Sequence, residues 1–242
     1  MKWNIGCSGF YYKEWKNLFY SPDLPQKKWF EFYCSKFDTL EMNVTFYQFP
    51  RKETLRKWFD ASPKNFRFSV KAPRLITHYK RLNDSMQLLD NFYKTIQDGL
   101  QEKLGAALFQ FPPSFVYTQD NLELVSDYLN RKDFINVTEF RHSSWWNANV
   151  YTELEKSNII FCGISHPKLP DTAVVNQNIA YYRFHGVPDL YNSEYRHESL
   201  EKIADVLLSA EKCKEVFIYF NNTASMAAIE NSMWLKKHLE ID

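Results

Sequence analysis

The sequence is poor in glycine and cysteine, and these shortages exclude several kinds of site. Only six glycines occur in 242 residues, and none forms a G-x-G-x-x-G or G-x-x-x-x-G-K-[ST] motif. The two common glycine-rich nucleotide cradles are therefore absent. The four cysteines are far apart and form no C-x-x-C pair, which argues against zinc-ribbon and thioredoxin-like sites and suits a reducing compartment. We predict no cofactor.

The chain also lacks an excess of charge and any long apolar run. Thirty Lys and Arg against 29 Asp and Glu give a formal net charge of +1, which leaves no strong electrostatic footprint for nucleic acid. The apolar runs are strand-sized, and the N-terminus has no apolar signal core. We predict a soluble cytoplasmic protein, not attached to a membrane, with one domain spanning residues 1–242.

Short β-rich runs recur along the chain and alternate with segments of helical periodicity. The runs cover residues 3–8, 39–45, 66–71, 106–111, 135–140, 159–163, 180–185 and 216–221. This alternation predicts an α/β protein with a parallel sheet, and eight such units match the (β/α)₈ TIM barrel. An open doubly wound sheet is the competing fold. The sixth helix is expected to be weak or missing, because residues 166–178 contain Pro167 and Pro170 and no apolar stripe.

Polar residues gather where these strands end, which is where TIM barrels build their sites. In the second run, Glu41, Asn43 and Thr45 are expected on one face and Val44 on the other, because side chains alternate along a strand. The other polar strand-end residues are Ser8, Lys71, Gln110, Glu139, Arg141, Arg183, His185, Asn221 and Asn222. Burying so many polar groups unpaired would cost several kcal/mol, so we expect a ligand site here.

Glu41 and Glu139 are the candidates for acid/base catalysis. They stand three strands apart, and barrel geometry allows their carboxyl groups to lie about 5–8 Å from one another, within the range of paired catalytic carboxylates. Lys71 and His185 are further catalytic candidates, since both can exchange protons near a substrate.

The cations at the strand ends outnumber the inward carboxylates. Lys71, Arg141 and Arg183 are expected to hold an anion or to stabilise developing negative charge, because arginine contacts phosphate and carboxylate in bidentate fashion. We therefore predict a small anionic or sugar-like ligand.

Seven blocks of sequence form a recognisable series. They are Gly6–Phe10 with Tyr12 and Trp15, Glu41–Tyr47, Phe68–Pro73 with Thr77 and His78, Phe109–Phe115, Glu139–Trp145, Tyr182–Gly186 and Tyr219–Thr223. The series resembles the YecE-like family of TIM-barrel proteins of unknown function, over nearly the whole chain. The resemblance implies the barrel but no reaction, cofactor or catalytic residue. The chain departs from the family at Cys7, Phe10 and Asn17, where Thr, Trp and Gly are common.

Taken together, the strand ends and the matching blocks give a set of residues predicted to bind or orient the substrate. The set is Ser8, Tyr12, Asn43, Tyr47, His78, Gln110, Arg141, His142, Trp145, Arg183, Asn221 and Asn222. Aromatic residues on the rim loops suit stacking as well as packing.

We hypothesise an enzyme, with hydrolase, lyase and isomerase chemistry all fitting the residues. One alternative is a barrel that binds nucleic acid or cleaves phosphodiesters, and another is a non-catalytic ligand-binding module. Glu139 and Arg141 also fit an internal ion pair that braces the barrel. A metal on Glu41, Glu139, His142 and His185 is the sharper alternative for those four residues, but nearby cations would repel it, so no metal is predicted.

Overall fold

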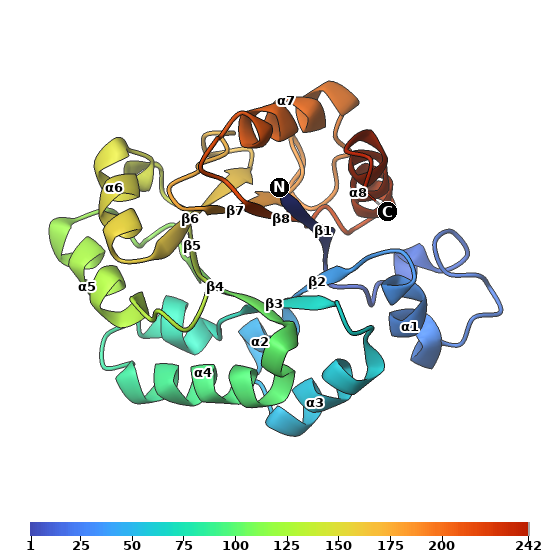
Figure 1. The fold of residues 1–242 in the computed structure, drawn as a ribbon, viewed down its shortest axis with the longest axis horizontal. Helices are drawn as coiled ribbons and strands as arrows, with labels where there is room; N and C mark the ends of the chain where they lie inside the picture. The colour runs from blue at the N-terminus through green and yellow to red at the C-terminus, as the bar shows by residue number, and fades with distance from the viewer. Residues whose placement is uncertain (242) are drawn as a thin grey trace.

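Eight parallel strands close into a barrel with helices arranged around it (Figure 1). The computed structural model describes residues 1–241. The strands are β1 (Lys2–Ser8), β2 (Thr39–Met42), β3 (Arg67–Lys71), β4 (Leu104–Phe111), β5 (Asn136–Phe140), β6 (Ile159–Ser165), β7 (Ile179–Phe184) and β8 (Glu215–Phe220). Each strand pairs with the next along the chain, and β8 pairs with β1. The predicted TIM barrel is confirmed.

Helices and short helical turns connect the strands. They are η1 (Lys13–Trp15), η2 (Gln26–Lys28), α1 (Trp29–Cys34), α2 (Val44–Tyr47), α3 (Lys52–Ala61), η3 (Leu75–Tyr79), α4 (Met86–Leu100), η4 (Gln101–Lys103), α5 (Gln119–Leu129), η5 (Ser143–Trp145), α6 (Ala148–Lys156), α7 (His197–Leu208) and α8 (Ala227–His238). Residues 166–178, all of them described, hold no helix between β6 and β7. No helix within residues 1–241 is both long and apolar enough to cross a bilayer.

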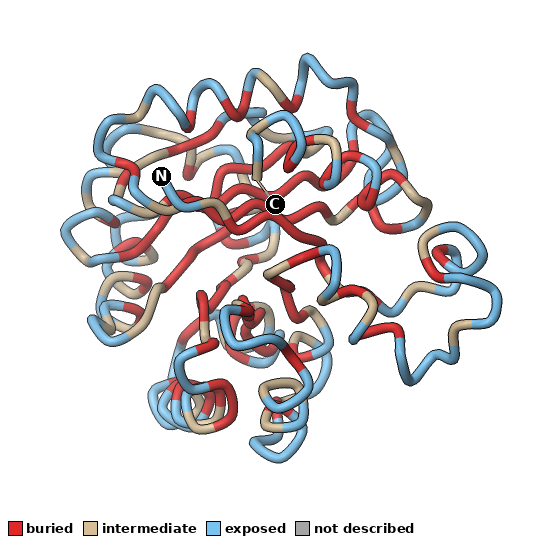
Figure 2. Tube along the Cα trace, turned by 45° about the vertical axis from the view of Figure 1, so that its right-hand side comes forward, coloured by how far each residue is buried: buried red, intermediate tan, exposed pale blue. Residues whose placement is uncertain are grey.

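Side chains on the two faces of the sheet belong to two separate hydrophobic cores. Outward side chains such as Phe109 and Phe140 pack with the helices in one large cluster, and the buried strands in Figure 2 lie inside a ring of helices with exposed outer faces. The inward apolar side chains form a second cluster: Ala106, Leu108, Val137, Ile160, Cys162, Ile164, Tyr181, Phe217 and Tyr219. Because side chains alternate, the next inward positions toward the strand ends are polar, for example Gln110, Glu139 and Arg183. The inward side chains are therefore apolar along the body of the strands and polar at their C-terminal ends.

The second strand is shorter than predicted. It ends at Met42, and residues 44–47 form the helical turn α2. The Thr45 hydroxyl lies 2.9 Å from the Met42 carbonyl and 2.6 Å from the Lys71 carbonyl, and its one proton, shared between these acceptors, stabilises the turn. The prediction that Asn43 and Thr45 share a strand face with Glu41, opposite Val44, is wrong. The early end of β2 instead leaves Val44 62% exposed beside the strand ends.

Candidate functional site

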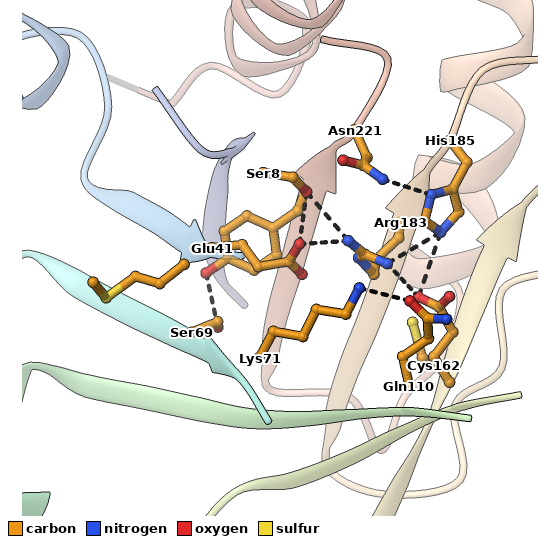
Figure 3. A network of polar contacts seen from close by, with 12 residues as sticks. Ser8, Glu41, Ser69, Lys71, Gln110, Cys162, Arg183, His185 and Asn221 are labelled. Atoms are coloured by element: carbon orange, nitrogen blue, oxygen red, sulfur yellow. Dashed lines mark hydrogen bonds and ion pairs between the residues drawn. The ribbon is translucent and has the colours of Figure 1, made fainter. Parts of the chain in front are cut away.

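Arg183 lies at the centre of the polar end of the barrel and binds both inward glutamates. Its Nη2 donates to Glu41 Oε1 at 2.6 Å, and its Nη1 donates to Glu139 Oε2 at 2.5 Å. All three side chains are fully buried. One guanidinium group thus separates the two carboxylates, and Figure 3 shows Arg183 between Glu41 on one side and His185 on the other.

Glu139 is the more heavily paired of the two glutamates. Arg141 Nε donates to its Oε1, and His185 Nε2 lies 3.4 Å from its Oε2. Burial alone would raise the pKa of Glu139, but the guanidinium groups of Arg141 and Arg183 hold it well below its usual value. Glu139 is therefore an ionised acceptor at neutral pH.

His185 is held neutral by its surroundings. Burial, followed by the charge of Arg141, lowers its pKa well below the usual value. Its Nε2 lies 3.1 Å from Arg141 Nη2 and 3.2 Å from Arg183 Nη1, and guanidinium groups can only donate. The proton of the neutral ring therefore belongs on Nδ1. Asn221 Nδ2 lies 2.9 Å from Nδ1 (Figure 3). Turning the Asn221 amide over exchanges its nitrogen and oxygen and places Oδ1 there to accept the Nδ1 proton.

Glu41 combines one charged partner with two neutral ones. The Ser8 hydroxyl donates to Glu41 Oε1 and the Tyr181 hydroxyl donates to Oε2, both at 2.6 Å. Burial and then the Glu41 charge raise the pKa of Tyr181 well above its usual value, so the phenol keeps its proton. Tyr181 was not among the predicted site residues, although it points inward two positions before Arg183 on β7.

Lys71 occupies the corner between β2 and β3 without a carboxylate partner. Its Nζ donates to Gln110 Oε1 at 2.6 Å (Figure 3) and lies 4.2 Å from the centre of the Phe46 ring. No ion pair to Lys71 occurs within residues 1–241. Burial, and next the charge of Arg183, lower the pKa of Lys71 to about 7. With 8% of its surface exposed, this amine exchanges its proton near neutral pH.

Two half-buried histidines border the same end of the barrel. Burial and neighbouring cations, with Lys71 first for His78 and Arg141 first for His166, lower the pKa of each to about 4. The His166 ring centre lies 6.0 Å from that of His185. His166 is the first residue of the loop 166–178, in which the sequence predicts no strong helix. Because β6 extends to Ser165 and not only to Gly163, His166 follows the strand directly.

Other predicted residues lie around this network without joining it. The Tyr12 hydroxyl donates to the Ser8 carbonyl at 2.5 Å, and His142 Nδ1 lies 2.8 Å from the Ser144 hydroxyl. Asn43 is half-buried, and within residues 1–241 no group donates to its buried Oδ1. Tyr47 is 70% exposed. These four residues stay predictions as ligand contacts.

Trp145 and Asn222 occupy structural positions. The Trp145 ring is fully buried, stacks on Phe140 at 3.9 Å between ring centres, and donates its indole N–H to the Phe115 carbonyl at 2.7 Å. Buried Asn222 donates to the Ser193 carbonyl and to Asn231 Oδ1, at 2.9 and 3.1 Å. Neither side chain has an exposed face for a ligand in this arrangement.

The acids and histidines of the site do not assemble into a metal centre. Within residues 1–241, no group of three or more His, Cys, Asp or Glu side chains has the arrangement of a metal site. The carboxylate oxygens of Glu41 and Glu139 face guanidinium groups instead. What the arrangement offers a ligand is one amine of variable charge, several amides and neutral imidazoles.

The sequence matches a known protein family over nearly its whole length. The family model described as "Protein of unknown function DUF72" matches residues 4–242. The chain belongs to the DUF72 family. Among DUF72 relatives, UPF0759 protein YunF of Bacillus subtilis is 26% identical over 255 residues, covering 92% of this chain and 90% of YunF. UPF0759 protein YecE of Escherichia coli is 31% identical over 85 residues, 35% of this chain and 31% of YecE. The predicted resemblance to the YecE-like family is confirmed.

Solved structures of DUF72 proteins share the fold closely. A DUF72 family protein from Thermotoga maritima is 28% identical and superposes with a TM-score of 0.90, covering 99% of this chain and 100% of that one. D-Psicose 3-epimerase from Clostridium cellulolyticum, at 9% identity and a TM-score of 0.53 over 97% of this chain and 90% of its own, shares the barrel fold alone.

Proposed function

We propose that this DUF72 protein is an enzyme that binds a small anionic or sugar-like substrate at the C-terminal end of the barrel, where Lys71 binds the anion and transfers a proton. The observation that carries the proposal is a nearly buried amine with no carboxylate partner in residues 1–241. The chemistry is proton transfer of the kind that hydrolases, lyases and isomerases share.

The charge balance of the site supports an anionic ligand. The positive charges of Arg141 and Arg183 are matched by the negative charges of Glu41 and Glu139, to which they are paired. Lys71 is left with neutral contacts only, the Gln110 amide and the Phe46 ring. A bound anion would supply the missing charge, and proton uptake by Lys71 would accompany binding because its pKa of about 7 would rise.

The same pKa suits Lys71 to acid/base work. An amine with a pKa of about 7 is present in both protonation states at neutral pH, which is the condition for efficient proton transfer. In this proposal Gln110, Asn43 and Asn221 orient the substrate, and neutral His78 and His166 supply further hydrogen-bonding groups at the rim.

The paired-glutamate hypothesis needs a carboxyl group that can carry a proton. Both carboxylates are fully buried and bound to guanidinium groups, and the pKa of Glu139 lies well below its usual value. We therefore assign Glu41 and Glu139 to holding Arg183 and Arg141 in place, and proton transfer to Lys71. This assignment predicts that Lys71→Met removes turnover of an identified substrate more completely than Glu41→Gln does.

Sulfate binding tests the anion site, because the charge of sulfate does not change near neutral pH. Titration calorimetry at about pH 6 and about pH 8.5 should show binding that weakens by about tenfold at the higher pH, as Lys71 loses its proton. Lys71→Met should abolish both the binding and its pH dependence. Lys168→Met, which removes an exposed lysine from the β6–β7 loop at the same end of the barrel, should leave both intact.

Equal sulfate affinity in wild type and Lys71→Met would refute the anion site. A second experiment distinguishes an enzyme from a non-catalytic binding module. Metabolites retained by wild type but not by Lys71→Met are incubated with the protein and analysed by mass spectrometry. Conversion to a product supports the enzyme, whereas unchanged release supports a non-catalytic module.

One observation favours a nucleic-acid-binding barrel as the second candidate. The exposed Arg74 side chain lies over the rings of Tyr47 and Tyr79, at 5.7 and 5.5 Å from their centres, next to the end of β3. Exposed aromatic rings with arginine suit stacking on bases. Oligonucleotide affinity measured against salt concentration decides, because phosphate contacts give a linear log–log decline. No binding, or no salt dependence, removes this candidate.

A further inference from the structure

A cavity opens between the C-terminal ends of β1 and β2. It has a volume of about 490 Å³ and is lined by residues 9–12, residues 40–44 and Trp58 of α3. Pockets of this size hold small organic ligands. A ligand bound at Lys71 therefore has neighbouring space for a larger group.

The wall of this cavity is aromatic. Phe10 packs edge-on against Trp58, with 5.3 Å between ring centres. Tyr11 and Val44, which also line the cavity, are 55% and 62% exposed, so apolar surface stands open to the solvent at its mouth. A planar apolar group is the ligand that such a wall binds by stacking and by release of water.

One polar atom in the wall has no partner. Asn43 Oδ1 is buried, and within residues 1–241 no N–H or O–H group reaches it. A buried acceptor without a donor costs about 1–3 kcal/mol. An N–H or O–H group on a bound ligand would remove that cost once the Asn43 side chain turns its Oδ1 into the cavity that the residue lines.

The cavity and the amine share one corner of the barrel. Met42 of β2 pairs with Val70 of β3, so the residues that follow them, Asn43 and Lys71, lie at neighbouring positions on adjacent strand ends. The turn α2 connects the two sites, since its Val44 lines the cavity and its Phe46 ring lies under the Lys71 amine. A ligand that spans these two adjacent strand ends would contact both.

We propose that the substrate is an aromatic anion that carries a hydrogen-bond donor: its acidic group binds at Lys71, its ring enters the cavity between β1 and β2, and the donor on the ring pairs with Asn43 Oδ1. This inference rests on the proposed anion site at Lys71 and adds the class of molecule that the site selects.

Two phosphate monoesters of the same charge, one with an aromatic ring and one without, test whether a ring adds to the affinity. Calorimetry near neutral pH should show phenyl phosphate binding at least about tenfold more tightly than methyl phosphate. Val44→Phe, which fills the cavity mouth from an exposed position, should remove this preference while methyl phosphate still binds. Tyr11→Ala, which removes part of the wall, should reduce the preference. The matched control is Val206→Phe, the same change at an exposed position of α7, which should leave the preference unchanged.

The three monohydroxyphenyl phosphates test the donor. At least one of them should bind about fivefold more tightly than phenyl phosphate, in keeping with one hydrogen bond to a buried acceptor. Asn43→Leu should remove that gain, so that in this variant the same isomer binds no more tightly than phenyl phosphate does. A gain that survives Asn43→Leu, or no gain for any isomer, overturns the donor pairing.

The outcomes separate this inference from the proposed function. If methyl phosphate binds through Lys71 but phenyl phosphate binds no more tightly, the aromatic class is overturned and the anion site stands. If Val44→Phe and Val206→Phe behave alike, the ring binds elsewhere and the cavity assignment is overturned. If neither ester binds, the proposed anion site and the inference built on it both fail.

Discussion

The centre of the barrel's polar end and its β2–β3 corner hold buried charge in opposite ways. At the centre, two carboxylates meet two guanidinium groups, and every charge has a partner of opposite sign. At the corner, the Lys71 amine contacts an amide and an aromatic ring. Compensated charges resist change, whereas an uncompensated charge responds to pH and to ligands. The ion pairs at the centre, formed by Glu41, Glu139, Arg141 and Arg183, therefore act as a structural brace, whereas the Lys71 corner responds to pH and to ligands.

The largest expected effect comes from breaking the brace at Arg183. Arg183→Met leaves Glu41 and Glu139 buried with fewer cations, and we expect the free energy of unfolding to fall by about 3–5 kcal/mol. Denaturant unfolding at neutral pH measures this loss. If the single variant does not fold, the triple variant with Glu41→Gln and Glu139→Gln should fold, because its buried negative charge is gone. A loss below about 1 kcal/mol for Arg183→Met would show that the centre is not a brace.

Much of this centre was predictable because strand alternation is local. Glu139 with Arg141, and Arg183 with His185, occupy positions two apart, so a sequence with known strand ends predicts that they point into one lumen. The eight repeated units predict the closed ring in the same way. Which acids pair with which cations could not be predicted, because these ion pairs depend on distances across the barrel. The sequence shows three inward cations and two acids but not which cation lacks a partner.

The corner was harder to predict because tertiary contacts decide its backbone. The β2 run looks like a continuing strand, but the Thr45 hydroxyl bonds to Lys71, a residue on the neighbouring strand, and the chain turns after Met42. For Trp145, after β5, the sequence left packing and stacking on a ligand both open, and its ring packs on Phe140 in the core. The end of β2 and the partner of Trp145 both depend on contacts that no local pattern reveals.

A smaller effect distinguishes the two glutamates within the brace. Glu139 faces two guanidinium groups and His185, whereas Glu41 faces one guanidinium group and two neutral hydroxyls. Glu139→Gln should therefore lower the free energy of unfolding by about 1–3 kcal/mol, more than Glu41→Gln does.

The pH dependence of stability checks the assignment to Glu139. Its pKa is lowered on folding, so its stabilising contribution is present above the unfolded glutamate pKa of about 4.3 and is lost as the pH falls below that value. Urea unfolding at about pH 7 and about pH 3 should show that wild type loses more stability on acidification than Glu139→Gln does. Equal losses of stability in wild type and Glu139→Gln would mean that the ionised Glu139 side chain does not stabilise the fold.

The last effect has the opposite sign and lies at the corner. Burying an amine that lacks a carboxylate partner costs free energy, so Lys71→Met should raise the free energy of unfolding at neutral pH by about 1–3 kcal/mol. The unfolded lysine has a pKa of about 10.4 and the folded one a pKa of about 7, so the unfolded chain binds more protons between these values. Wild-type stability therefore rises with pH across this window, and the advantage of Lys71→Met should shrink as the pH approaches about 10. Thermal and urea unfolding at several pH values measure both trends. If Lys71→Met were destabilising at every pH, Lys71 would belong to the brace together with Arg183, and the distinction between the two regions would disappear.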